Sequence, residues 1–200
     1  MTLRHALTLL VLLTPLAASA QWVRQPVPTD AEFYDIVALT DQRLVTVGRD
    51  GAIFQTENGG ATWTFRDDTN YYADAFRAAY AVDPLFVVAV TEDGALYKST
   101  DGGLTWGLAG NIPVRRGDFF AFDVHFRSRT DGWIVGADYL PPYDDFLWHT
   151  TDGGATWTSE FLFENSRAQL LYIDFEGEKG WTGTDGGTFF RTTDGGQTWT

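Results

Sequence analysis

An eight-residue pattern occurs four times in this chain, and it restricts the possible folds more than any other feature. The copies read TENGGATW, STDGGLTW, TTDGGATW and TTDGGQTW, and they end at Trp63, Trp106, Trp157 and Trp199. These tryptophans are 43, 51 and 42 residues apart. A repeat of about 40 to 45 residues that contains turn residues is typical of propeller blades, each a four-stranded sheet. The spacing therefore predicts an all-β chain of successive antiparallel sheets.

Each repeat also carries strand and hairpin signals outside the octet. Asp-Gly pairs separate two apolar runs at Asp50, Asp93 and Asp185, and such pairs favour tight hairpin turns. We expect first strands near residues 33–39, 76–82, 119–126 and 169–175, and second strands near 44–47, 85–90, 133–137 and 180–183. Third strands run into the octets, and fourth strands are expected to leave from Ala61, Leu104, Ala155 and Gln197.

The octets themselves look like structural turns. Their third residue can accept hydrogen bonds from backbone N–H groups of the turn, the Gly pair permits left-handed backbone angles, and the Trp buries a large apolar area. Calcium binding is the competing interpretation, but the octet lacks the further spaced oxygen ligands of a calcium loop. We therefore predict no metal and no cofactor. The predicted structural residues are Asn58, Trp63, Asp101, Trp106, Asp152, Trp157, Asp194 and Trp199.

The first twenty residues match the pattern of a secretory signal peptide, with Arg4, an apolar run and Ala18-Ser19-Ala20 before Gln21. Residues 21–200 are then the propeller part, with export to the periplasm or extracellular space. The chain has no cysteine, which excludes disulfides and predicts no lipoprotein anchor. Its net charge of -13 opposes binding to nucleic acid. No later apolar run is long enough to span a membrane.

Both ends bear on the size of the ring. Residues 21–27 resemble a fourth strand and are expected to complete the last blade, as strand exchange does in closed propellers. Thr198-Trp199-Thr200 also begins a fourth strand. We therefore expect about four blades of a larger ring of about seven, although a complete four-bladed ring is the alternative.

Loop parity predicts where binding residues lie. In a four-stranded blade, the first-to-second turns and the octets share one face, and the second-to-third hairpins and the connections between blades share the other. The second face varies most, and Tyr and Arg are favoured interface residues. The predicted binding loops contain Tyr71, Tyr72, Arg115, Arg116, Tyr139, Tyr143, Asp144, Asp145 and Arg167. Ordinary solvated loops are the alternative. We predict packed roles for His125 and His149, and no catalytic residue.

The octets resemble the Asp-box, or bacterial neuraminidase repeat, of sialidases, xyloglucanases and sortilin-type receptors. The longer unit, with Asp123-Val124-His125-Phe126, Gly132-Trp133-Ile134-Val135-Gly136 and the third octet, is similar to photosystem II assembly and stability factors. This resemblance implies a non-catalytic scaffold that binds another exported or membrane-associated protein, in a lumen if the source is photosynthetic. The competing functions are glycan binding and a glycoside hydrolase of sialidase or xyloglucanase type. The arginine motif expected near the N-terminus of a sialidase is absent.

Overall fold

The computed structural model describes residues 23–66, 75–113, 119–138, 145–161 and 169–200. These residues form four antiparallel sheets, and their only helical element is the short 3₁₀ turn η1 (Arg49–Gly51). Sheet 1 contains β1 (Phe33–Ala38), β2 (Leu44–Gly48), β3 (Ile53–Thr56) and β4 (Thr64–Phe65). Sheet 2 contains β5 (Phe76–Ala81), β6 (Val87–Thr91), β7 (Ala95–Ser99) and β8 (Gly107–Asn111).

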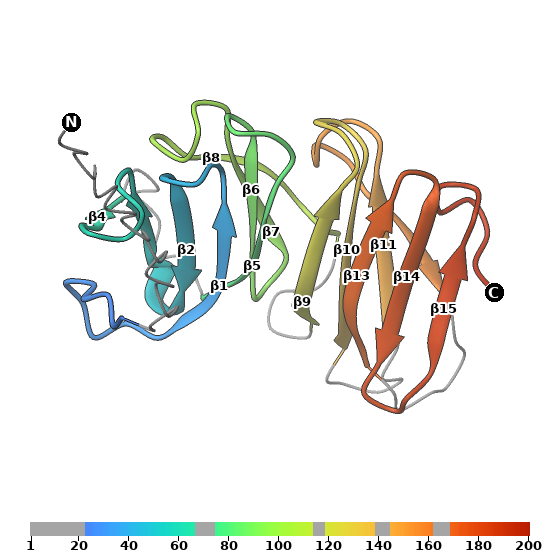
Figure 1. The fold of residues 1–200 in the computed structure, drawn as a ribbon. Coiled ribbons are helices and arrows are strands. Elements are labelled where there is room, and N and C mark those ends of the chain that lie inside the picture. Colours follow the sequence, from blue (N-terminus) through green and yellow to red (C-terminus); the bar gives the residue numbers. More distant parts are fainter. Residues whose placement is uncertain (1–22, 67–74, 114–118, 139–144, 162–168) are drawn as a thin grey trace, which may run out of the picture.

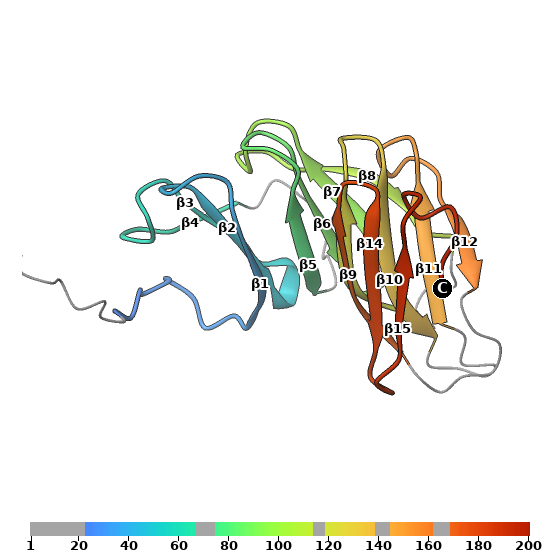
Figure 2. The ribbon, with the colours of Figure 1, turned by 45° about the vertical axis from the view of Figure 1, so that its right-hand side comes forward.

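Sheet 3 contains β9 (Phe119–Phe126), β10 (Gly132–Asp138), β11 (Asp145–Thr150) and β12 (Thr158–Phe161). Sheet 4 contains β13 (Leu170–Glu176), β14 (Lys179–Thr184) and β15 (Phe189–Thr192). Strands within each sheet are neighbours in sequence order, as the hairpin signals predicted. The four sheets follow one another in an open row with sheets 1 and 4 at its ends (Figures 1 and 2). The all-β propeller architecture is thus confirmed, and the four described sheets do not close into a ring of four.

The predicted start of the fourth strands was wrong by a few residues. The expected starts at Ala61, Leu104 and Ala155 lie within the octet turns, and β4, β8 and β12 begin only after the octet Trp. The octet carboxylate or amide holds the N–H of the Thr before the Trp, so the chain cannot join the sheet earlier. In sheet 4 no fourth strand is assigned, but Thr200 and Arg191 exchange two backbone hydrogen bonds of 2.9 Å.

The predicted division of loops between two faces is confirmed by backbone hydrogen bonds. The first Gly of each octet donates its N–H to a carbonyl in the first-to-second turn of its own sheet, as Gly153 does to Thr130 at 2.9 Å. On the opposite face, residues of the second-to-third hairpins bond to the chain just before or at the first strand, as Glu92 N–H does to Ala75. Octets and connections between sheets therefore lie on opposite faces.

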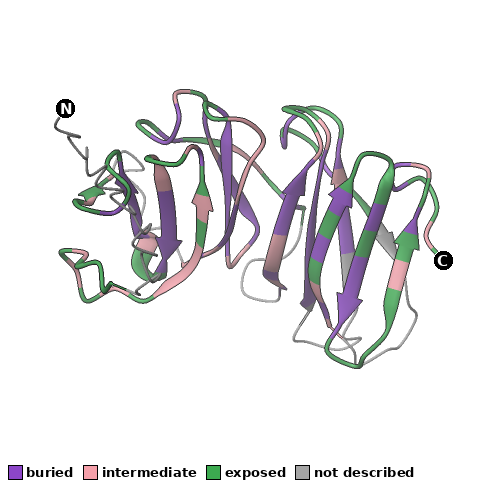
Figure 3. Ribbon diagram, viewed as in Figure 1, coloured by how far each residue is buried: buried purple, intermediate pink, exposed green. Residues whose placement is uncertain are grey.

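The core lies between successive sheets, and each junction contains the same three positions. One comes from the second strand of a sheet, one from its third strand, and one from the first strand of the following sheet. The three sets are Val45, Ile53 and Ala79; Val88, Leu96 and Val124; and Trp133, Leu147 and Ile173. All nine side chains are buried, and the buried residues lie mainly along the strands of the inner sheets (Figure 3).

The segment before β1 differs from the expected strand. Residues 21 and 22 lie outside the described residues, and residues 23–27 have no strand assignment. Gln25 lies beside the first octet, because a Cβ placed on Gly60 would come within 3.4 Å of its side chain. Completion of a blade by residues 21–27 therefore stays a prediction.

Candidate functional site

Most of the predicted binding-loop residues lie outside the described residues. This applies to Tyr71, Tyr72, Arg115, Arg116, Tyr139, Tyr143, Asp144 and Arg167. Asp145 is the first residue of β11, where it pairs with Ala137 on β10, and only its backbone is described. The loop between β10 and β11 joins a second strand to a third, so it belongs to the face opposite the octets. The assignment of these residues to a binding site stays a prediction.

The octets on the other face are closed hydrogen-bonded turns. In the third octet, the buried Thr150 hydroxyl accepts the N–H of Gly154 at 2.9 Å and donates to Asp152 Oδ1 at 2.9 Å. Asp152 also accepts the N–H of Thr156 at 2.8 Å and its hydroxyl at 2.6 Å. These bonds, with that of the Thr156 hydroxyl largest, lower the pKa of Asp152 to about 2. The carboxylate is therefore ionised and engaged within its own turn.

The other octets repeat this geometry. Asp194 accepts the hydroxyls of Thr198 and Thr192, and these bonds lower its pKa to about 2. In the first octet Asn58 replaces the carboxylate: its Oδ1 accepts the N–H of Thr62, and its Nδ2 donates to the Thr62 hydroxyl. An amide that performs the same task indicates that charge is not essential to the turn. The polar side chains of these octets therefore bond within their own turns.

The second octet Gly is required by the neighbouring sheet. Gly154 has a φ of +88°, and a Cβ there would collide with Leu96 of sheet 2. The octet tryptophans Trp106 and Trp157 are buried and donate Nε1–H to the carbonyls of Gly103 and Gly154 at 3.1 Å. The octets of sheets 2, 3 and 4 therefore close their own sheets and pack against the preceding one.

Two aspartates on first strands connect neighbouring sheets, and sequence reasoning missed this role. Asp35 on β1 accepts the N–H of Ala79 on β5 at 2.8 Å, and Asp123 on β9 accepts the N–H of Ile173 on β13 at 2.9 Å. Burial raises the pKa of Asp123 to about 6, against the lowering effect of its two backbone hydrogen bonds. The signal was present in the sequence, since an Asp precedes an aliphatic residue at the same place in repeats 1 and 3.

A cavity of about 370 Å³ lies beside Asp123, and its lining includes Tyr80, His125, Asp174 and Trp181. The His125 ring packs 4.2 Å from that of Tyr80, and its Nδ1 lies 3.2 Å from Asp174 Oδ1. Burial lowers the pKa of His125, so the ring is neutral near pH 7 even though Asp174 opposes this effect. His125 thus packs between sheets, as predicted.

His149 occupies a packed position too. Its ring stacks 4.4 Å from that of Trp133, and its Nε2 lies 2.7 Å from Asp131 Oδ1. Within the described part of the chain, no three His, Cys, Asp or Glu side chains converge as metal ligands would.

Antiparallel sheets that each carry a self-bonded Asp-box turn define the fold of this chain as that of an Asp-box β-propeller. Residues 109–200 match the family model described as Photosynthesis system II assembly factor YCF48. Over 80 residues the chain is 36% identical to the Photosystem II assembly lipoprotein Ycf48 of Synechococcus sp. (strain CC9902). The aligned residues make up 39% of this chain and 22% of that protein. The chain therefore spans about a fifth of the length of this curated relative.

Solved structures show the same fold. YCF48 from Cyanidioschyzon merolae aligns with a TM-score of 0.58 and 19% identity, over 89% of this chain and 58% of that one. An ancestral GH74 enzyme aligns with a TM-score of 0.64 and 17% identity, over 90% of this chain and 25% of the enzyme. Identities this low establish the propeller fold alone. The sequence matches are what distinguish the assembly factors as the group to which this chain is similar.

Proposed function

We propose that this chain is part of an exported, non-catalytic β-propeller that binds a protein partner, in the manner implied by the name of the photosystem II assembly factors. The match of residues 109–200 to the YCF48 family model carries this proposal, and the 36% identity to the Synechococcus lipoprotein supports it. The match covers sheet 3 with its longer β10–β11 connection and sheet 4, so it includes the predicted loop residues Tyr139 and Tyr143.

The chemistry of the octets favours a scaffold over an enzyme. Asp152 and Asp194 occupy the same position in two of the repeated octets. Their oxygens are occupied by hydroxyl and N–H groups of their own turns, which hold the pKa of each carboxyl at about 2. Such a carboxylate is a poor proton donor or acceptor near neutral pH. We therefore propose that recognition uses the opposite face, to which loop parity assigns the predicted Tyr and Arg loops.

Export and association with a membrane protein fit the same proposal. The named relative is a lipoprotein, and the first twenty residues of this chain have the pattern of a signal peptide. In the described residues, no helix is long and apolar enough to cross a membrane. We propose that the chain meets its partner at the membrane surface, on the side to which it is exported.

A peptide-binding measurement tests the proposal. YCF48 has been solved bound to a D1 peptide, so a fluorescently labelled D1 peptide is a suitable probe. We expect saturable binding by fluorescence anisotropy, which is lost in a Tyr139→Ala/Tyr143→Ala variant and weakened in an Arg115→Ala/Arg116→Ala variant. Leu85→Ala and Arg24→Ala change exposed residues outside these loops and serve as controls.

The result also separates the alternatives. Equal binding by the loop variants and the controls would remove these loops from the site. Release of reducing sugar from xyloglucan or of sialic acid from a sialoside by the purified chain would contradict the non-catalytic assignment. The similarity to the GH74 enzyme is a similarity of fold alone. Among the described residues, none favours hydrolysis over binding.

A further inference from the structure

The first octet differs chemically from the other three. It has Asn58 at the position of the octet aspartates, and Gly59 follows it directly. The side-chain amide of an asparagine can react with the backbone nitrogen of the next residue, and glycine leaves that nitrogen unshielded because it has no side chain. The residues that follow the other asparagines all carry side chains, and they are Tyr71, Ile112 and Ser166. Among the asparagines of this chain, Asn58 is therefore the one where this reaction meets the least steric hindrance.

In the closed turn, both reacting groups are held by hydrogen bonds. Asn58 Oδ1 accepts the N–H of Thr62 at 2.9 Å and the hydroxyl of Thr56 at 3.0 Å, and its Nδ2 donates to the Thr62 hydroxyl at 2.9 Å. The Gly59 N–H donates to the carbonyl of Gln42, in the β1–β2 turn, at 2.8 Å. Attack requires this nitrogen to lose its proton and the Asn58 side chain to rotate toward it. The closed turn therefore opposes both steps.

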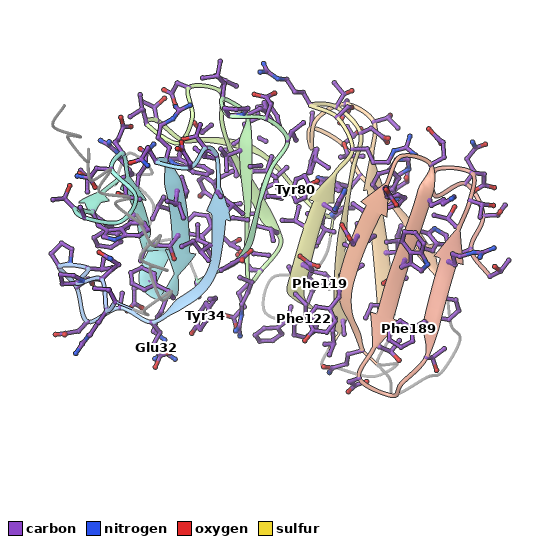
Figure 4. All side chains as sticks on the ribbon, viewed as in Figure 1. Glu32, Tyr34, Tyr80, Phe119, Phe122 and Phe189 are labelled. Atoms are coloured by element: carbon purple, nitrogen blue, oxygen red, sulfur yellow. The ribbon has the colours of Figure 1, made fainter. Side chains whose placement is uncertain are left out.

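The turn lies on the octet face, where water reaches it. Asn58 and Gly59 are both exposed. Figure 4 shows Glu32 and Tyr34 at the lower edge of sheet 1, whereas the β1–β2 turn that holds Gly59 is at its upper edge. A reaction at Asn58 therefore leaves unchanged the opposite face, which is proposed for recognition.

We propose that Asn58 is a site of spontaneous deamidation, and that opening of the first octet turn sets its rate. In the open turn, the Gly59 nitrogen gives up its proton and attacks Cγ of Asn58, so that a new C–N bond closes a cyclic imide. The bond from Cγ to Nδ2 breaks, and ammonia leaves with that proton. Water then hydrolyses the imide at one of its two carbonyls and yields either aspartate or isoaspartate. Water is the only co-reactant that these steps consume.

The two products affect the turn differently. Aspartate at this position is the side chain of the other octets, and in the third octet it accepts the N–H of Thr156 at 2.8 Å and its hydroxyl at 2.6 Å. Isoaspartate adds one methylene group to the backbone before Gly59, so the N–H groups of Gly59 and Gly60 can no longer both keep their partners. We expect the aspartate form to keep the turn and the isoaspartate form to lose it.

Peptide mass spectrometry of the full chain measures the reaction, because replacement of NH₂ by OH raises the mass of the fragment that contains position 58. The chain is incubated at mildly alkaline pH, either folded or unfolded in guanidinium chloride. We expect deamidation of Asn58 in both samples, slower by roughly tenfold or more in the folded chain because only the open turn reacts. Asn58→Gln should remove the signal, since its longer side chain would have to close a larger ring. Asn111 is the internal control, since the branched side chain of Ile112 shields the nitrogen that would attack it.

Two matched substitutions test whether the turn itself controls the rate. The buried Thr56 hydroxyl accepts the N–H of Gly60 at 2.9 Å and donates to Asn58 Oδ1, so Thr56→Val loosens the first octet. Thr150→Val makes the same change in the third octet, which contains no asparagine. We expect Thr56→Val to speed deamidation of the folded chain by roughly tenfold, and Thr150→Val to leave the rate unchanged. Circular dichroism checks that both variants fold.

The products are assigned by comparison with the Asn58→Asp chain and by labelling of isoaspartate with an isoaspartyl methyltransferase. Asn58→Asp should keep or raise the Tm, whereas the separated isoaspartate form should melt at a lower temperature. Equal rates at Asn58 and Asn111 in the unfolded chain would overturn the assignment of the site. Equal rates in the folded and unfolded chains would overturn the control by the turn. Equal acceleration by Thr150→Val and Thr56→Val would do the same, because the reaction would then proceed through unfolding of the whole chain.

Discussion

The side chain that closes each octet should be the Ser or Thr at its first position, and Thr150→Val tests this directly. Valine nearly keeps the shape of threonine, so the change removes hydrogen bonds without leaving a cavity. The Thr150 hydroxyl accepts N–H groups of Gly154 at 2.9 Å and Asp152 at 3.3 Å, and it donates to Asp152 Oδ1 at 2.9 Å. Thr150 is 2% exposed, so water cannot readily replace it.

The cost follows from these contacts. A buried N–H without a partner costs about 1 to 3 kcal/mol, and loss of the bond to the carboxylate adds about 1 kcal/mol because Asp152 is exposed and retains its Thr156 partners. We therefore expect the free energy of unfolding to fall by about 2 to 4 kcal/mol. For a chain of this size that corresponds to a drop in Tm of roughly 5 to 15 °C. Urea unfolding followed by circular dichroism and tryptophan fluorescence measures the change.

Thr156→Val is the matched control within the same turn. The Thr156 hydroxyl is exposed and donates only to Asp152 Oδ2, at 2.6 Å, while the Thr156 N–H bond to Asp152 is kept. Water can solvate the freed oxygen, so this variant should lose about 1 kcal/mol or less. The reasoning is refuted if Thr150→Val is the milder of the two changes, or if it leaves the urea midpoint unchanged at a constant m value.

Two further predictions concern charge. Burial raises the pKa of Asp123 to about 6 from the usual 3.8. Between pH 4 and pH 6 the Asp123 carboxyl therefore holds a proton in the folded state that it has released in the unfolded state. Because of this difference, the contribution of Asp123 to stability falls as the pH rises from about 4 through 6. The difference in unfolding free energy between the parent chain and Asp123→Asn should therefore shift against the parent by up to about 3 kcal/mol between pH 4 and pH 7, and a pH-independent difference would refute this. Calcium at millimolar concentration or EDTA should leave the Tm unchanged, since the Asp152 and Asp194 oxygens are engaged within their turns; a rise in Tm with calcium alone would instead support a metal site.

The strands could be placed from the sequence because the four repeats align, so that a strand expected in one repeat is expected at the same place in the others. The octets fix where third strands end, and the predicted first strands agree with β1, β5, β9 and β13 within about two residues. The fourth strands were placed too early, because the extent of the octet turn depends on which N–H groups its carboxylate holds. Which N–H groups the carboxylate holds depends on the three-dimensional geometry of the turn and cannot be deduced from the residue types alone.

Contacts between repeats were harder to foresee. Asp35 and Asp123 bond to backbone N–H groups that lie 44 and 50 residues further along the chain. Local patterns show that each Asp precedes an aliphatic residue within a first strand, but they do not show which group the Asp side chain meets in the next sheet. Similarly, Phe189 and Leu147 are both apolar residues before an octet, and only the arrangement of the sheets reveals that one is exposed and the other buried.

The junctions between sheets are similar but not identical, and the differences show how the row is held together. Asp35 connects sheets 1 and 2, and Asp123 connects sheets 3 and 4, whereas Ala78 stands at the equivalent position of sheet 2 and makes no such bond. Sheets 2 and 3 are joined instead by the ion pair of Arg129 and Asp83, at 2.9 Å, and by the tilted packing of the Tyr80 ring against that of His125. An exposed ion pair contributes little, so apolar packing of Val88, Leu96 and Val124 carries that junction. Apolar packing is common to all three junctions, so it is the interaction that holds successive sheets of the row together.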